Sequence, residues 1–146
     1  MGDGSCTGLS AKTTSDNAGA FGAGVVIEVE PEFLEDRSVP AEDAYVWAYT
    51  VRIENHRSEA VRLLSRYWRI TDARGVVQEV RGDGVVGEQP LIQPGECYEY
   101  TSGTPLRTPS GLMSGSYQME TPDGTRFEAE IPAFSLDSPY ETRARN

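Results

Sequence analysis

Apolar side chains recur at every second position along most of this chain, and no window shows the three-to-four-residue repeat of an amphipathic helix. The stretch 45–55 is the clearest case. Its large apolar residues are Tyr45, Trp47, Tyr49, Val51 and Ile53, and they alternate with Ala48, Thr50, Arg52 and Glu54. Successive side chains of a strand point to opposite faces, so this pattern predicts a strand with one buried face.

Further strands are predicted where the alternation returns, at Val25–Glu30, Val61–Thr71, Val76–Val80, Cys97–Thr101, Leu112–Glu120 and Arg126–Phe134. Turn sequences separate them at 72–75, 93–96 and 121–124, each ending on or containing a glycine. The adjacent Leu63 and Leu64 indicate a bulge. Pro105 and Pro109 predict a long loop over 101–111. Seven or eight short strands without a helix predict an all-β, two-sheet antiparallel sandwich.

The domain is expected over residues 25–136, between a disordered polar tail (1–24) and a polar tail (137–146). Cys6 and Cys97 match neither a disulfide framework nor a zinc motif, so two free thiols in a reducing compartment are expected. The first twenty residues have no apolar core of a signal peptide, and no apolar run approaches a membrane span. These features predict a cytoplasmic protein.

The net charge of −10 disfavours binding to nucleic acid or to an anionic membrane. His56 is the sole histidine, and neither cysteine has a base near it in sequence, so no catalytic residue and no enzyme activity are predicted. Glu128 and Glu130 alternate on one strand, where a solvated face is the simpler interpretation. No metal site or cofactor is predicted.

Several segments resemble the ApaG family: Leu63–Asp72, Val80–Pro90, Tyr100–Gly103, Thr108–Gly111, Met113–Met119 and Ile131–Leu136. The resemblance covers residues 25–136. It implies a fibronectin type III-like or immunoglobulin-like sandwich, a bacterial protein, and a link by phenotype to cobalt and magnesium tolerance, which we interpret as indirect. It also implies a partner-binding role, and it implies no agreed biochemical activity.

A G-x-G-x-x-G pattern occupies residues 82–87, where Gly82, Asp83, Gly84 and Gly87 are a candidate anion loop. In dinucleotide-binding folds such a loop opens a helix. Pro90 and Pro94 exclude a helix after this loop, and its carboxylates repel anions. A structural loop is therefore the preferred interpretation. A sensor of phosphate, pyrophosphate or a nucleotide stays the alternative, because glycine-rich backbone can form an anion nest alone.

The stretch 52–81 is basic within an acidic chain, with seven arginines against four carboxylates, a net charge of +3. The candidate partner-binding residues are Arg62, Arg66, Arg69 and Arg81, beside Tyr67, while Trp68 is expected in the core. The leading hypothesis is a non-catalytic module that binds an unknown protein partner; an enzyme acting on phosphate esters is a third hypothesis. An edge strand could also pair with itself to give a homodimer.

Overall fold

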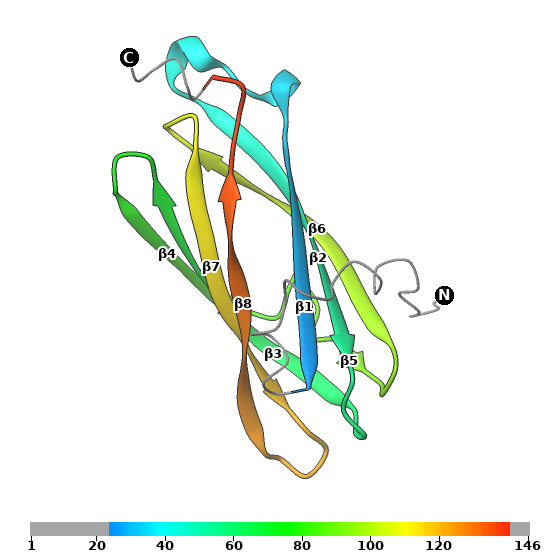
Figure 1. Cartoon of the computed structure of the whole chain (residues 1–146). Helices are drawn as coiled ribbons and strands as arrows, with labels where there is room; N and C mark the ends of the chain where they lie inside the picture. Colours follow the sequence, from blue (N-terminus) through cyan, green and yellow to red (C-terminus); the bar gives the residue numbers. More distant parts are fainter. Residues whose placement is uncertain (1–23, 141–146) are drawn as a thin grey trace.

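The computed structural model describes residues 24–140, which form eight β-strands in two antiparallel sheets (Figure 1). The first sheet has the order β1 (Val25–Phe33), β2 (Tyr45–Asn55), β6 (Cys97–Leu106). The second has the order β4 (Val77–Asp83), β3 (Val61–Asp72), β7 (Gly111–Glu120), β8 (Arg126–Leu136), and β5 (Leu91–Ile92) also pairs with β3. The only helical elements in this part of the chain are two single 3₁₀ turns, η3 (Glu35–Arg37) and η4 (Pro40–Glu42). The predicted sandwich is confirmed.

The strict alternation predicted for β2 is confirmed from Tyr45 to Ile53. Trp47, Tyr49, Val51 and Ile53 are buried, and the intervening Ala48, Thr50 and Arg52 are half-buried. The β2 strand lies between β1 and β6, so both of its backbone edges are paired and its apolar face is turned to the second sheet.

Aromatic side chains join the two sheets across the core. The rings of Tyr49 on β2 and Trp68 on β3 pack edge to face with centroids 5.3 Å apart, so the expected core position of Trp68 is confirmed. The hydroxyl groups of Tyr100 on β6 and Tyr117 on β7 are hydrogen-bonded at 2.6 Å. Burial raises the pKa of both phenols, so they stay protonated at neutral pH.

The predicted bulge and turns are confirmed, with one correction. The β3–β7 register shifts between Leu63 and Ser65. Strict alternation counted back from Trp68 would put Leu64 in the core, but Leu63 is fully buried and Leu64 is only half-buried, because the bulge absorbs one residue. Each predicted turn closes with a hydrogen bond from its fourth residue to its first, over 72–75, 93–96 and 121–124.

Several strand limits differ from the prediction. The β6 strand continues to Leu106, so the loop expected over 101–111 is wrong for its first half. Pro105 fits because β6 is an edge strand, where a missing N–H need not interrupt a ladder. The strands β1, β4 and β8 also extend beyond their predicted ends. The two-residue β5 was not predicted, since Pro90 and Pro94 flank it.

The structure corrects the expectation of a free thiol at Cys97. Cys97 is disulfide-bonded, so the expected free thiol is wrong and the cysteines no longer support a reducing compartment. Cys6 and residues 1–23 and 141–146 lie outside the described residues.

Residues 137–140, assigned to a polar tail, contact the domain. The indole N–H of Trp47 donates to the Asp137 carbonyl oxygen at 2.8 Å, and Tyr140 packs edge to face on Phe33.

Candidate functional site

The candidate site lies on the solvent-facing side of the β4–β3–β7–β8 sheet, here called the outer face. Strand register arranges its residues in rows across the four strands. The two central rows are Arg81–Tyr67–Ser116–Glu130 and Asp83–Ser65–Gln118–Glu128. At one end of the face, the row containing Thr71 also holds the exposed Val77 and Leu112. The outer face therefore joins an apolar end to a polar centre.

Two contacts hold the Tyr67 side chain in place at the polar centre of the outer face. Its hydroxyl donates to Glu79 Oε2 at 2.7 Å, and the Arg81 guanidinium carbon lies 4.6 Å from its ring centroid. Arg81 Nη1 also lies 3.8 Å from Glu79 Oε1. The hydrogen bond to Glu79 raises the pKa of Tyr67, which keeps the phenol a hydrogen-bond donor. These contacts hold the Tyr67 ring and the Arg81 guanidinium together on the surface.

A hollow of about 630 Å³ opens over the two central rows. Small or slender side chains, Ser65, Ser116 and Gln118, line its β3 and β7 side, while Tyr67 and Arg81 on one side and Glu128 on the other stand around them. Small side chains between longer ones explain the depression in an otherwise regular sheet. Its lining offers hydroxyl, amide, guanidinium and carboxylate groups, so it suits a polar ligand carrying both donors and acceptors.

Arginines and carboxylates alternate on the outer face, which changes the charge argument made from sequence. Arg62 lies opposite Glu120 and Arg69 opposite Glu79 in the strand register. The β8 strand adds the exposed Glu128 and Glu130. The net +3 of the stretch 52–81 is therefore not a basic patch in space, because strands from elsewhere in the sequence bring carboxylates beside it. The surface is mixed in charge.

Arg66 stands apart from the other candidate arginines. It occupies the inward phase of β3, and its Nη1 donates to the carbonyl oxygens of Asp83 at 3.0 Å and Gly84 at 2.8 Å. Two backbone carbonyls, rather than a carboxylate, therefore accept from this inward guanidinium. The guanidinium also lies directly over Gly82, where a Cβ would be 2.7 Å from Nη2. Arg66 thus holds the start of the glycine-rich loop, whereas Arg62, Arg69 and Arg81 are exposed.

The glycine-rich loop is a tight hairpin. The amides and carbonyls of Val85 and Glu88 are bonded to each other at 2.8 and 2.9 Å, and Val86 and Gly87 between them have positive φ angles. This geometry is a two-residue type I′ turn. The Gly84 amide donates to the Leu64 carbonyl oxygen at 2.8 Å. The backbone N–H groups of Gly84, Val85 and Glu88 therefore already donate to carbonyl oxygens of the protein. The glycine spacing is the remaining support for the anion-sensor alternative.

Potential metal ligands do not converge in the part of the chain that the structure describes: no group of three or more His, Cys, Asp or Glu side chains is placed to hold an ion. His56 Nε2 lies 2.9 Å from Glu54 Oε1. Glu128 and Glu130 are both exposed on β8. Within residues 24–140, no helix is long and apolar enough to cross a membrane.

Sequence reasoning found the arginines and Tyr67 but missed the residues that complete the hollow. Ser116, Gln118 and Glu128 come from β7 and β8, about fifty residues further along the chain, and only the register places them beside β3. One signal was available: the run Ser114–Gly115–Ser116 is unusually small for a strand centre. A Cβ at Gly115 would collide with the Tyr67 carbonyl oxygen, so β7 can approach β3 closely there.

Both the sequence and the fold of this chain are similar to those of known proteins. The ApaG domain family matches residues 35–121. The chain belongs to the ApaG family. The ApaG protein of Parvibaculum lavamentivorans is 66% identical over 117 residues, which cover 80% of this chain and 90% of that protein. The ApaG protein of Methylorubrum extorquens is 61% identical over 120 residues, covering 82% and 92% of the two chains.

A solved structure with a similar sequence agrees with the sandwich. The crystal structure of the ApaA protein from Bordetella pertussis superposes with a TM-score of 0.77 at 49% sequence identity, covering 79% of this chain and 94% of that one. The names of these relatives state no catalytic activity. The family membership expected from sequence is confirmed.

Proposed function

We propose that this ApaG-family domain is a non-catalytic module that binds a partner protein through its outer face. The observation that carries the proposal is the pairing of Tyr67 and Arg81 at the edge of the hollow, with Arg69 exposed beside them. Tyrosine and arginine are the residues most enriched at the energetic centres of protein interfaces. Here both are held in position before any partner arrives, which lowers the entropic cost of binding.

The apolar end of the outer face supports the same proposal. Leu112 is 52% exposed and Val77 is 42% exposed, and the register places one on each side of Thr71. A partner that covers this row and the hollow would bury apolar surface beside an aromatic residue and fixed charges. Alternating charges on the face would set the orientation of the partner more than its affinity.

The test is recovery of partners from native lysate with two matched variants. Arg69→Ser with Arg81→Ser removes two positive charges from the outer face. Arg37→Ser with Arg107→Ser removes the same charge from an exposed 3₁₀ turn and from an exposed position just after β6, on the other sheet. We expect the outer-face variant to lose at least about 90% of a specifically recovered protein, since interface arginines commonly contribute over 1 kcal/mol each.

Equal recovery of the protein by both variants, with unchanged thermal melts, would show that the partner binds outside the outer face.

The proposal makes the link to cobalt and magnesium tolerance indirect, through the partner. The cytoplasmic location and an edge-strand homodimer also stay predictions. Self-pairing through β1 is disfavoured by Pro31 and by its three glutamates, Glu28, Glu30 and Glu32, because proline and charge are common protections of an edge strand.

A further inference from the structure

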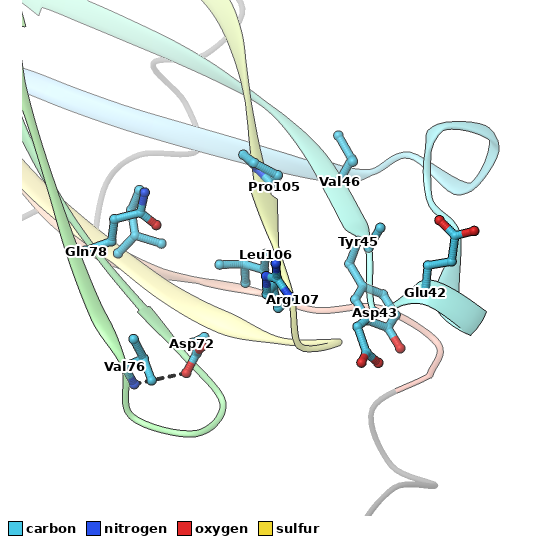
Figure 2. A pocket seen from close by; sticks show the side chains of 12 residues that line it. Glu42, Asp43, Tyr45, Val46, Asp72, Val76, Gln78, Pro105, Leu106 and Arg107 are labelled. Carbon is cyan, nitrogen blue, oxygen red and sulfur yellow. Dashed lines mark hydrogen bonds between the residues drawn. The ribbon is translucent and has the colours of Figure 1, made fainter.

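A second hollow, here called the end pocket, lies between the two sheets at one end of the sandwich. It measures about 450 Å³ and is lined by residues of η4, β2, β3, β4 and β6 and of the adjoining turns (Figure 2). In the view of Figure 2, Val76, Gln78 and Asp72 stand on one side, and Glu42, Asp43 and Tyr45 stand on the other. It shares no lining residue with the hollow on the outer face.

The floor of the end pocket is formed by core side chains that are slightly exposed to solvent. Tyr45, Ile70 and Leu106 line it, and each is 7% exposed. Val76 stands at its mouth and is 61% exposed, more than any other large apolar side chain of the described residues. A ligand with an apolar group would cover this surface, and each buried CH₂ contributes about 0.8 kcal/mol.

The rim of the end pocket is acidic. Three carboxylates, those of Glu42, Asp43 and Asp72, stand against one cation, Arg107. Asp43 has a left-handed φ of 56°, and its backbone N–H is bonded to the Pro40 carbonyl oxygen at 3.0 Å, which fixes where its carboxylate leaves the chain. The net charge of −10 on the chain reinforces the local preference for a positive ligand.

Unpaired strand edges beside the end pocket suit an extended backbone. Among residues 24–140, the β4 and β6 strands stand at the ends of their sheet orders, β4 pairing with β3 alone and β6 with β2 alone. Gln78 on β4 and Leu106 on β6 both line the pocket. A peptide can add its own N–H and C=O groups to such an edge while one side chain enters the adjoining hollow.

We propose that the end pocket binds an extended peptide that presents an apolar side chain next to lysine or arginine. The apolar group lies against Tyr45, Ile70 and Leu106, and the cation pairs with the carboxylates of Glu42 and Asp43. This site is independent of the outer face, so either proposal can fail without the other.

The probe is the capped pentapeptide acetyl-Ala-Arg-Leu-Arg-Ala-amide, titrated into the full-length protein while backbone amide shifts are recorded. Two matched peptides replace both arginines by glutamate, or the leucine by serine. We expect saturable shifts in the segments that line the end pocket, 42–46, 76–78 and 105–107, with the first peptide. Each matched peptide should bind at least about tenfold more weakly, the loss expected for a removed charge pair or buried side chain.

Matched variants separate the pocket from its surroundings. Val76→Ser should weaken the pentapeptide about fivefold, whereas Val77→Ser, whose side chain belongs to the outer face, should leave its affinity unchanged. Glu42→Gln with Asp43→Asn should also weaken it, and asparagine keeps the left-handed backbone. Glu128→Gln with Glu130→Gln removes the same charge from the outer face and should have no effect.

Three results would overturn the proposal. The first is an absence of pocket shifts at millimolar pentapeptide, and the second is equal binding of the glutamate peptide. The third concerns the chain's own end: Tyr140 packs against Tyr45 with ring centroids 6.0 Å apart, and Arg143 and Arg145 follow it in sequence. If Arg143→Ser with Arg145→Ser shifts the pocket amides without peptide and tightens pentapeptide binding, the occupant is this chain's own terminus.

Discussion

Replacing Gly82 by alanine should destabilise the protein only while Arg66 is present. A Cβ at Gly82 would lie 2.7 Å from Arg66 Nη2 and 2.8 Å from its Cζ. The φ angle of Gly82 is not positive, so alanine can adopt this backbone without strain. The guanidinium is therefore the obstacle, and it must leave its position above the strand.

The expected magnitude follows from the bonds that the guanidinium would give up. Arg66 Nη1 donates to two carbonyl oxygens, those of Asp83 and Gly84. Hydrogen bonds to charged groups contribute about 1.5–3 kcal/mol each, and a displaced guanidinium at this half-buried site regains part of that from water. We expect Gly82→Ala to lower the free energy of unfolding by about 1–3 kcal/mol.

In the Arg66→Ala background the sign should reverse. With the guanidinium absent, alanine loses less backbone entropy than glycine and should gain about 0.5–1 kcal/mol. Urea unfolding of the four proteins measures the coupling directly. Equal effects of Gly82→Ala in the two backgrounds would refute the reasoning. Gly84→Ala is the control: its φ is 61° and the Glu88 carbonyl lies in the way, so it should destabilise both backgrounds.

Three other changes test the core and the loop. Tyr100→Phe or Tyr117→Phe alone should cost about 1–3 kcal/mol in urea unfolding, because a buried hydroxyl loses its partner, while the double change should cost less than the sum. Because burial raises both pKa values above 10.0, the unfolded chain loses these protons first, so stability should fall as pH rises above 10 and fall less in the double variant. Val86→Asn should raise the melting temperature by stabilising the folded state about 1 kcal/mol, because valine at φ 40° is strained and Asn-Gly is preferred in a type I′ turn. Trp47→Ala should cost about 3–5 kcal/mol, and a loss below about 1 kcal/mol would contradict its place in the core.

The sheets could be predicted because their signals are local. In β2, alternation from Tyr45 to Ile53 is a direct consequence of one face packing on the core. The turn at 93–96 follows from Pro94 and Gly95, whose backbone preferences match its central positions. Local signals failed at Pro105, because a proline excludes a central strand but not an edge strand, and edge position depends on the whole topology.

The candidate site was only half predictable for the same reason. The arginines and Tyr67 belong to one strand pair, so their grouping is visible in sequence. Their neutralisation by Glu120, Glu128 and Glu130 depends on β7 and β8 lying beside β3, which no count along the chain reveals. Arg66 was grouped with the others, although it shares the inward phase of β3 with the buried Trp68 and Ile70. The end pocket was not predicted, since its lining comes from five separate elements.

Site-specific photo-crosslinking in the native cell tests the central claim most directly. A photoreactive amino acid replaces Leu112 on the outer face in one variant and the exposed Thr101 on the other sheet in a second. The account predicts a discrete crosslinked protein from position 112 that is absent from position 101 and disappears when Arg69 and Arg81 are changed to serine. The same product from both positions, or a product from position 101 alone, would contradict a partner-binding role for the outer face.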